Sequence, residues 1–366
     1  MVSGQPFPSR FWSCYSFLAA WIVILFVSLW IFHDTAFQLV SHAPEITIPP
    51  PAATTPVPSL DDLAAPPVIV TEPQVVSEAP SSPSPSPSPS PVPPAVQPTD
   101  EDKGIPRKLW YKMGPHGVSE EIRGWTKTCI DLNPGYEVDW MTEESGDNMV
   151  KRVFASRPEL VQDFLAIQVP IVKADILRYV MLYDQGGVWS DLDVSCEGIP
   201  IDKWIPEEYK NKVDLVVGWE FDYGWEGNYV RQFTSWTIMA RKGSPHLLQT
   251  IDDTFEALHQ KANENHVSVG NVTMKMMGDV VDFSGPRRLT FAIYKSLSKQ
   301  LKREVVEGDM SKLLQPKLVG DVLALPGRSF AASTNRYTPE EEAKMPPKLV
   351  IHHYAGSWKN EHGGEQ

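Results

Sequence analysis

The sequence predicts an α/β domain with a mostly parallel central sheet, preceded by a transmembrane helix and a disordered stem. Predicted strands and helices alternate from residue 105 onward, which is typical of helices packed on a parallel sheet. Before them lie a 22-residue run without a charged side chain and a segment rich in serine and proline. We therefore expect a cytoplasmic tail at 1–10, a signal-anchor helix at 11–32, a stem at 33–104 and the folded domain at 105–366.

The uncharged run, 11–32, has the length that a membrane-spanning helix needs. At about 1.5 Å per residue it spans roughly 33 Å, which matches the hydrocarbon core of a bilayer. A cleaved signal peptide is the alternative, but its apolar part is normally only about 7–15 residues long. Arg10 precedes the run and Asp34 follows it. The positive-inside rule therefore places the short tail in the cytoplasm and everything after the helix on the other side.

The segment 44–98 contains more than half of the protein's 34 prolines, many of them in Ser-Pro repeats. Such repeats form neither a sheet ladder nor a core, and they favour extended polyproline conformations. This segment is predicted to be a spacer between the membrane and the folded domain.

The part of the chain after the predicted anchor helix is characterised by its charge, its cysteines and one N-glycosylation sequon. Residues 105–366 carry 31 basic and 37 acidic side chains, and a mildly acidic domain without a basic face excludes nucleic acid as a partner. Cys14 lies in the membrane segment, which leaves Cys129 and Cys196. An oxidising compartment permits a disulfide between these two, but a domain with a full core does not require one. Asn271 begins an N-glycosylation sequon, which fits the lumenal side.

The secondary structure of the folded domain is predicted from hydrophobic patterning and from the Gly and Pro residues that interrupt it. Runs rich in β-branched and aromatic residues predict strands, and longer segments with apolar residues three and four apart predict helices. In order, we expect a strand at 105–111, a helix at 119–132, a strand at 135–140, helices over 142–184 broken at Pro158 and Pro170, a strand and its exit at 186–193, strands at 213–220 and 233–240, helices at 244–261 and 286–301, and strands at 322–326 and 348–355.

The helix before residue 186 is predicted to be buried, because two apolar stripes cover most of its circumference. Asp175 and Arg178 lie one turn apart on it, and an internal ion pair is the plain interpretation of that spacing. Gly186 and Gly187 then end the helix in left-handed conformations and turn the chain into the next strand.

Asp191 and Asp193 follow that strand at its carboxyl end, where open α/β sheets bind ligands. Side chains two residues apart in a strand point the same way, so both carboxylates can converge on one cation. Oxygen ligands favour Mg²⁺ or Mn²⁺, which usually complete their coordination with substrate phosphates. An isolated Asp-x-Asp is a weak signal, since acidic pairs in turns are commonly just solvated.

The sequence "LVIHHYAGSWK" near the carboxyl terminus supplies a further metal ligand. Its apolar strand ends in a His-His pair, and neutral imidazole is a good ligand for metals such as Mn²⁺. Lys359, six residues after His353, could neutralise a diphosphate. A structural role for the histidine is the alternative.

Several segments together resemble a known family. They are "IPRKLW", "NPGYEVDW", "ADILRYVMLYDQGGVWSDLD", "FTSWTIMARKGSPHLL", "FSGPRRLT", "GDVLALP" and "HHYAGSWK", which occur in the family's order over 105–360. The chain is similar to glycosyltransferases with an Asp-x-Asp sugar-binding region, and in particular to the fungal initiation-specific α-1,6-mannosyltransferases of glycosyltransferase family 32. The helix and Asp-x-Asp block is highly specific, and each other segment is moderately so.

The resemblance implies a GT-A-type, Rossmann-like nucleotide-sugar-binding fold, a GDP-mannose donor and Mn²⁺, with Mg²⁺ as the alternative. It implies that Asp193 binds the metal and that Asp191 contacts the metal or the nucleotide ribose. It further implies that Asp175 holds hydroxyls of the donor sugar and that Arg178 contacts the sugar diphosphate. These four residues are the expected catalytic set.

The tail and the first strand receive roles by the same resemblance. His353, Gly356 and Lys359 match a His-x-x-Gly-x-x-Lys arrangement in which the histidine binds metal and the lysine binds the diphosphate. The remaining residues expected to bind the donor are Ile105, Pro106, Trp110, Gly187 and Trp358. The sequence departs from the family at Trp189, where Tyr or Phe is usual, and at "SGPRRLT", which replaces a threonine-led, glycine-rich version and bears on acceptor recognition.

The expected function is that of a type II Golgi membrane enzyme, a retaining α-1,6-mannosyltransferase that elongates N-glycans on glycoproteins or mannan. One alternative is mannosyl transfer to inositol phosphorylceramide. Enzymes of that kind carry hydrophobic segments after the catalytic domain, and this sequence ends at Gln366 without one, so we expect a glycan acceptor. The other alternative is a non-catalytic lumenal carbohydrate-binding protein, and the intact acidic, histidine and lysine positions argue against it.

Overall fold

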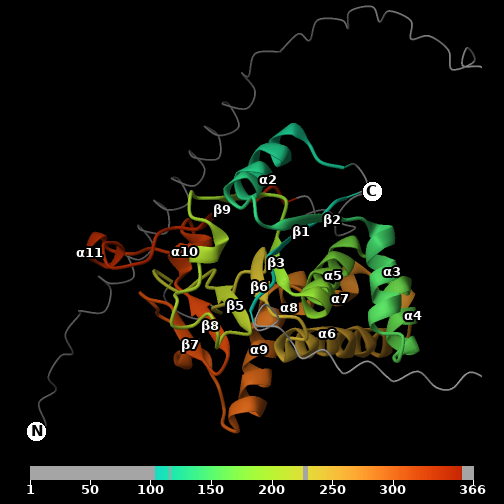
Figure 1. Ribbon diagram of the computed structural model, residues 1–366. Helices are drawn as coiled ribbons and strands as arrows, with labels where there is room; N and C mark the ends of the chain where they lie inside the picture. The colour runs from blue at the N-terminus through green and yellow to red at the C-terminus, as the bar shows by residue number, and fades with distance from the viewer. Residues whose placement is uncertain (1–103, 115–116, 226–229, 357–366) are drawn as a thin grey trace, which may run out of the picture. The chain divides into compact units, whose positions relative to one another are not determined.

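The computed structural model describes residues 104–114, 117–225 and 230–356 (Figure 1). The predicted anchor at 11–32 and stem at 33–104 lie outside these residues except for Gly104. Among the described residues, no helix combines the length and hydrophobicity that a membrane crossing requires.

A seven-stranded mixed sheet forms the centre of the folded domain. Five of its strands share one direction, which confirms a mostly parallel sheet, whereas β6 and β7 run the other way. In spatial order the strands are β2 (Glu137–Met141), β1 (Lys108–Lys112), β3 (Gly187–Ser190), β6 (Thr237–Ala240), β5 (Leu215–Gly218), β8 (Val322–Leu325) and β7 (Lys317–Val319). Strand β7 was not predicted, because its three residues, Lys-Leu-Val, are too few to establish an alternating pattern.

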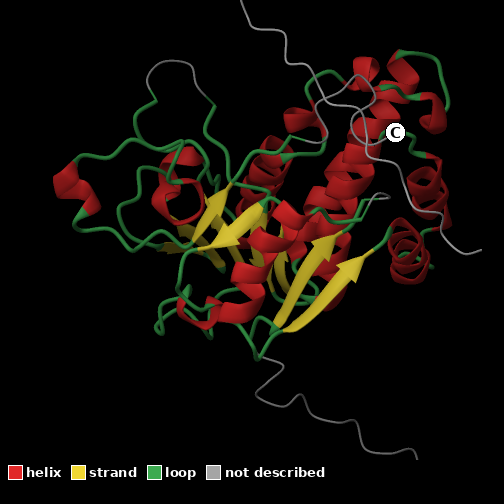
Figure 2. Ribbon diagram, turned by 90° about the horizontal axis from the view of Figure 1, so that it is seen from above, coloured by secondary structure: helices red, strands yellow, loops and turns green. Residues whose placement is uncertain are grey.

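Helices cover both faces of the sheet, so the domain has three layers (Figure 2). Neighbouring residues of one strand pack on opposite faces: Val216 belongs to one core, and Leu215 and Val217 belong to the other. The helices are α2 (Glu120–Leu132), α3 (Glu143–Val153), α4 (Pro158–Ala166), α5 (Pro170–Gln185), α6 (Pro245–Glu264), α7 (Met274–Met277), α8 (Val280–Phe283), α9 (Pro286–Leu301), α10 (Gly327–Ala331) and α11 (Pro339–Glu342).

The late strand expected at 348–355 is shorter and lies outside the main sheet. It is β9 (Val350–His352), which pairs antiparallel with β4 (Val194–Cys196), the strand that follows the Asp-x-Asp loop. In this register Val194 lies opposite His352. The small two-stranded sheet therefore brings the carboxyl-terminal histidines to the predicted metal ligands.

Helix α5 begins with Pro170 in its first turn and is buried along most of its length, as predicted. It ends at Gly186 (φ 67°) and Gly187 (φ 102°). A Cβ on Gly186 would lie 2.7 Å from the Lys242 nitrogen, and one on Gly187 would lie 2.7 Å from the Lys108 oxygen. Only glycine satisfies both the positive φ and this close approach. The two glycines therefore set the entry of β3 into the sheet.

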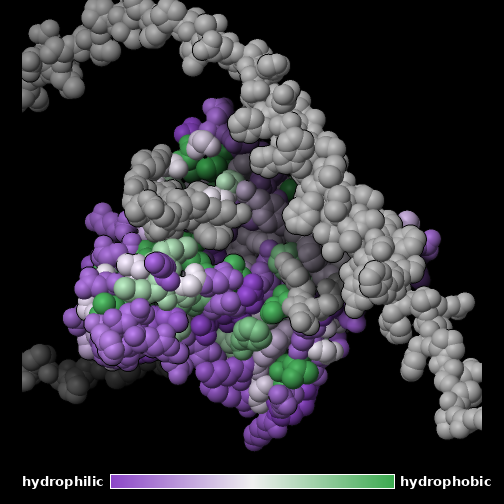
Figure 3. Space-filling model, turned by 180° about the vertical axis from the view of Figure 1, so that it is seen from behind, coloured by the Kyte–Doolittle hydropathy of each residue, from purple (hydrophilic) through white to green (hydrophobic). Residues whose placement is uncertain are grey.

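On the face seen in Figure 3, the described residues are mostly hydrophilic, and hydrophobic ones lie in small separate groups. The large hydrophobic side chains that are exposed on the described surface, such as Phe291 and Val306, are scattered along the chain. Scattered exposure of this kind is normal for a protein surface. Among the described residues, this face therefore carries no contiguous hydrophobic patch of the kind that marks a binding surface.

Candidate active site

A pocket of about 420 Å³ opens at the carboxyl edge of the sheet. It receives side chains from α5, from the ends of β1, β3 and β5, from the start of β6, and from the segment after β9. The polar and aromatic residues that line it include Lys112, Asp175, Arg178, Asp191, Asp193, Glu220, Gln232, Trp236, His352 and Tyr354. The four residues predicted to be catalytic are thus brought together at one pocket.

The predicted Asp175–Arg178 ion pair is present, with 3.0 Å between Oδ1 and Nη1. Both side chains are about 5% exposed or less. Arg178 also reaches across to the loop after β3, where its Nη2 donates to Asp191 Oδ1 at 3.2 Å. Ser284 donates to Asp175 at 2.7 Å. Arg178 therefore connects the buried helix to the Asp-x-Asp loop.

Arg178 retains hydrogen-bonding capacity at the pocket. Its Nε and Nη1 are buried and have no hydrogen-bond partner among the described residues, although Nη1 is within ion-pair distance of Asp175. A buried N–H group without an acceptor costs free energy that an anionic ligand would recover. The arginine thus has one buried donor, Nε, without a partner among the described residues.

Burial raises the pKa of both Asp175 and Asp191, and the positive charge of Arg178 offsets only part of this effect. The negative charge of Asp193 raises the pKa of Asp191 further. Carboxylates that are held together in this way favour a cation between them. The loop is therefore electrostatically prepared for a metal ion.

Asp193 is oriented by the carboxyl-terminal segment. The Ala355 backbone N–H donates to its Oδ2 at 2.9 Å, and His352 Nε2 lies 3.3 Å from its Oδ1. Burial alone would raise the pKa of Asp193, but the interaction with His352 and the Ala355 hydrogen bond outweigh it and lower that pKa. Asp193 is thus held as an anion at the pocket.

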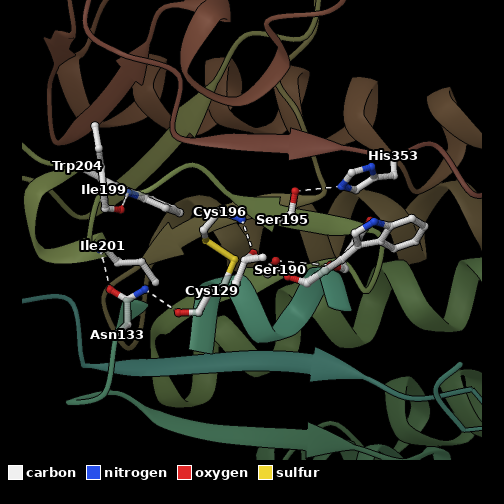
Figure 4. The surroundings of a disulfide bond; sticks show 12 residues. Cys129, Asn133, Ser190, Ser195, Cys196, Ile199, Ile201, Trp204 and His353 are labelled. Atoms are coloured by element: carbon white, nitrogen blue, oxygen red, sulfur yellow. Dashed lines mark hydrogen bonds between the residues drawn. A yellow bond between two sulfur atoms is a disulfide. The ribbon is translucent and has the colours of Figure 1, made fainter. Parts of the chain in front are cut away.

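The histidine at this cluster is His352, not His353 as the sequence predicted. His353 Nε2 instead lies 2.9 Å from Ser195 Oγ (Figure 4). The His353 ring stacks on Trp125. Adjacent residues of an extended segment point to opposite sides, so only one histidine of the pair can face the aspartates. The spacing motif selected the wrong member of the pair.

The donor set fits a divalent cation. Ligand atoms of Asp191, Asp193 and His352 all lie within 4.8 Å of one another. Two carboxylates and an imidazole suit Mn²⁺ or Mg²⁺ and leave coordination positions for phosphate oxygens. The His352 ring stacks on Trp236 with centroids 4.2 Å apart and planes 3° apart, which fixes its orientation. These three residues form the candidate metal centre.

A disulfide joins Cys129 of α2 to Cys196 of β4 (Figure 4). In the same place Thr128 Oγ1 accepts a hydrogen bond from the Cys196 N–H at 2.8 Å. Because β4 begins one residue after Asp193, these links fasten the segment beyond the metal centre to α2. The pairing left open by the sequence is therefore part of the support of the site.

Four of the residues expected to bind the donor lie away from the pocket. Gly187 begins β3, while Asp191 follows its other end, and Ile105 and Pro106 precede β1 at the same amino-terminal edge. Trp110 lies within β1, and its Nε1 donates to the Gly186 carbonyl at 2.8 Å. These residues position the strands, whereas Lys112 at the carboxyl end of β1 lines the pocket.

Of the other predicted residues, Gly356 and Asn271 lie in the described part of the chain, and two lie outside it. Gly356 (φ 67°) lines the pocket, whereas Trp358 and Lys359 lie outside the described residues. Asn271 of the sequon is exposed at the end of a short 3₁₀ helix, so its side chain is accessible.

Sequence reasoning missed two residues of the site: Glu220, which lines the pocket, and Ser284, which is buried behind it and supports Asp175. Glu220 follows β5 within "VVGWEFD", which was read only as a strand. Ser284 lies in "FSGPRRLT", which suggested acceptor recognition and gave no sign of a contact with Asp175. Both reach their places at the site through tertiary packing, which no local sequence spacing indicates.

Comparison with known proteins points to the same part of the chain. Residues 119–210 match the family described as glycosyltransferase sugar-binding region containing DXD motif. The chain is 29% identical to the initiation-specific α-1,6-mannosyltransferase of Candida albicans, over 72% of this chain and 74% of that protein. It is 31% identical to the Schizosaccharomyces pombe protein of the same name, over 70% of this chain and 64% of that protein.

Solved structures were compared as well. The UDP-bound glycosyltransferase domain of the YGT toxin aligns with a TM-score of 0.37 and 11% identity, over 57% of this chain and 82% of that domain. Residues 119–210, which contain the Asp-x-Asp loop and its supporting helix, thus match a glycosyltransferase sugar-binding region, and the chain is similar over 70–72% of its length to fungal initiation-specific α-1,6-mannosyltransferases.

Proposed function

We propose that the protein is a metal-dependent, retaining α-1,6-mannosyltransferase of the GT-A type that uses GDP-mannose to elongate N-glycans or mannan. The observation that carries the proposal is the convergence of Asp191, Asp193 and His352 beside the buried Arg178 in one pocket. A nucleotide sugar needs a cation for its diphosphate and hydrogen bonds for its sugar, and this pocket offers groups for both.

The central chemical problem is the charge that develops on the departing diphosphate. Asp191, Asp193 and His352 would hold Mn²⁺ or Mg²⁺, which supplies electrostatic stabilisation of that leaving group. Arg178 adds its positive charge and a buried Nε–H that has no hydrogen-bond partner among the described residues. Asp175, fixed by Ser284 and Arg178, is placed to accept hydrogen bonds from hydroxyls of the donor sugar.

Retention of configuration is proposed from the relatives, with the acceptor hydroxyl attacking from the face that the phosphate leaves. In that step the new bond joins the acceptor oxygen to the anomeric carbon, the bond from that carbon to the phosphate oxygen breaks, and the hydroxyl proton passes to the departing phosphate. Trapping of a mannosyl-enzyme ester on an aspartate or glutamate would contradict this mechanism.

A glycan acceptor is favoured over a lipid. The α-1,6-mannosyltransferase relatives match over 70–72% of this chain. The inositol phosphoceramide mannosyltransferase 3 of Schizosaccharomyces pombe matches over 27%. The longer match extends beyond the Asp-x-Asp block, which supports a shared acceptor class.

The proposed location is the Golgi membrane, with residues 11–32 as a single anchor and the catalytic domain in the lumen. The Cys129–Cys196 disulfide supports an oxidising compartment. The exposed Asn271 sequon supports the same side of the membrane. Glycosidase-sensitive mass on the wild-type chain that is absent from Asn271→Gln would test this topology.

The activity is tested with the full-length chain in detergent, a panel of nucleotide sugars and a chelator control. We expect Mn²⁺-dependent turnover of GDP-mannose that EDTA abolishes and that Asp193→Ala lowers by about 10³-fold. Turnover of UDP-glucose or UDP-galactose instead would reject the donor. Unchanged activity of Asp193→Ala would reject the metal centre.

A further inference from the structure

Glu220 is a buried carboxyl group of the pocket that the proposed mechanism does not use. It lies two residues after β5, at the same edge of the sheet as Asp191, and one strand, β6, separates β5 from β3. Its exposed fraction is 8%, and it lines the 420 Å³ pocket together with the metal centre. Buried carboxyl groups require a reason, because burial without a partner is costly.

The backbone and one oxygen of Glu220 are held firmly. Its N–H donates to the Gln232 carbonyl at 2.8 Å, and its own carbonyl accepts from Asn335 Nδ2 at 2.9 Å. Gln232 Nε2 donates to Oε2 at 2.6 Å, and Gln232 is fixed in turn by Arg287 Nε at 3.0 Å. No hydrogen bond from the described residues reaches Oε1. The carboxyl group is thus fixed in place with one oxygen left for a ligand.

Tyr354 presents an aromatic ring on the same pocket. It is 41% exposed, and its backbone has a φ of 53°, a left-handed conformation that few residues other than glycine adopt. Its ring packs edge-on to His352 with centroids 4.1 Å apart. Tyr354 and Glu220 both line this pocket.

A fixed carboxyl oxygen beside an exposed aromatic ring suits a neutral sugar. Sugar hydroxyls donate hydrogen bonds to carboxylates, and the C–H face of a pyranose packs on an aromatic ring. A nucleotide diphosphate would be repelled by another carboxylate without a cation, and Asp175 and Arg178 already serve the donor. The chemistry of this wall therefore points to the acceptor.

We propose that Glu220 and Tyr354 form the acceptor subsite, where Glu220 Oε1 accepts a hydrogen bond from a hydroxyl of an acceptor mannoside and Tyr354 packs on its ring. This inference rests on the proposed function and assigns that function's acceptor side. Glu220 is a positioning residue in this scheme, since the hydroxyl proton still passes to the departing phosphate.

The test uses Glu220→Gln in the full-length chain, with GDP-mannose, Mn²⁺ and α-1,6-mannobiose as the acceptor probe. The amide oxygen of the variant can still accept from Gln232, so the fold is preserved, but the free acceptor becomes an NH₂ donor. We expect kcat/KM for mannobiose to fall about 10- to 100-fold, mainly through KM. Hydrolysis of GDP-mannose without mannobiose should stay within about twofold of wild type, which a merely structural defect would not allow.

Two further variants sharpen the result. Tyr354→Ala should raise KM for mannobiose while Tyr354→Phe leaves it unchanged, because the ring and not the hydroxyl makes the contact. Asp253→Asn is the matched control: Asp253 is also 8% exposed but pairs with Lys295, and it is not among the residues of the pocket. Its kinetics for both substrates should match wild type.

Each contrary outcome has a distinct meaning. Unchanged acceptor kinetics of Glu220→Gln would overturn the subsite, and an equal loss of hydrolysis and transfer would overturn its assignment to the acceptor. Wild-type protein that hydrolyses GDP-mannose but never transfers to mannobiose would overturn the mannoside. If wild type turned over no GDP-mannose, the proposed function would fail. Saturation-transfer NMR of mannobiose with wild type and Glu220→Gln would then decide the subsite without turnover: signal with wild type alone supports it, and equal or absent signal overturns it.

Discussion

Two clusters, each of two aspartates and one histidine, lie at opposite edges of the central sheet. Asp191, Asp193 and His352 gather beyond the carboxyl end of β3. The second cluster gathers before the amino ends of β5 and β8 and at the start of α6, and it consists of Asp214, His246 and Asp321. Both groups satisfy the same distance criterion for a cation. Composition and spacing therefore do not distinguish them.

Their electrostatics do not distinguish them either. Burial raises the pKa of Asp191 and of Asp214, whereas hydrogen bonds from histidine outweigh burial and lower the pKa of Asp193 and of Asp321. Each cluster thus contains one carboxyl group of each kind. A perturbed pKa alone would identify both as functional sites.

The difference lies in access and in the partners of the oxygens. Ser244 donates to Asp214, and His246 and Gln300 each lie 2.8 Å from an oxygen of Asp321. The His246 side chain is fully buried, and none of that cluster's three residues lines the 420 Å³ pocket. The cluster at the carboxyl edge lines the pocket together with Arg178. The cluster of Asp214, His246 and Asp321 therefore joins elements of the fold, whereas the cluster at the carboxyl edge has the access that a ligand requires.

The largest expected effect separates the two clusters by activity. Asp193→Asn removes a metal-binding charge, so metal-dependent turnover of GDP-mannose should fall by about 10³-fold. Asp321→Asn should leave turnover within about threefold of wild type. The reverse pattern, measured at saturating Mn²⁺ with both proteins shown to be folded by circular dichroism, would mean that the two clusters have been assigned the wrong way round.

The next effect concerns Arg178, which lines the pocket. Arg178→Met leaves Asp175 and Asp191 without their shared cation, and breaking a buried ion pair on one side typically costs about 3–5 kcal/mol of unfolding free energy. Urea denaturation measures this loss. The double variant Asp175→Asn/Arg178→Met should recover part of it, and a single variant as stable as wild type would show that the pair is not desolvated.

Loss of the disulfide should have a somewhat smaller effect. Cys129 and Cys196 are 67 residues apart in sequence, and removing a native disulfide that closes a long loop lowers stability by about 2–4 kcal/mol. Cys129→Ser, Cys196→Ser and the double variant should lose the same amount, because each removes the same bond. Denaturation curves that differ among the three would indicate that the cysteines do not act through that bond.

The smallest effect tests the structural cluster through pH. Asp321 has a lowered pKa in the folded state, so its contribution to stability is present above its unfolded pKa and disappears as the pH falls through the folded one. Asp321→Asn should therefore be about 1–2 kcal/mol less stable than wild type at pH 7. The gap should close below about pH 3. A gap that persists in acid would show that the Asp321 charge is not what stabilises this edge.

Much of this arrangement follows from sequence patterns. The apolar stripes of 170–185 and the glycine pair predicted a buried helix that turns into a strand, and the structure has both. The predicted strand also placed Asp191 and Asp193 at its carboxyl end. These features were predictable because periodicity and backbone conformation are local properties of the chain.

What failed depended on contacts between distant segments. The choice between His352 and His353 is made by the pairing of β9 with β4, and no spacing within "IHHYAG" encodes which side of that small sheet faces the aspartates. Ile105 and Pro106 were assigned to the donor although they precede β1, at the edge away from the pocket. Glu220 reaches the pocket only because β5 lies beside β6 in the folded sheet.

Binding of Mn²⁺ in the presence of GDP, followed by the electron paramagnetic resonance signal of the free ion, tests the central claim most directly. The account predicts that wild-type protein and Asp321→Asn each bind one Mn²⁺ and that Asp193→Asn and His352→Ala lose it. His353→Ala should bind as wild type does. Loss of Mn²⁺ in Asp321→Asn or His353→Ala, with binding retained in Asp193→Asn and His352→Ala, would contradict the assignment of the metal centre to the carboxyl edge.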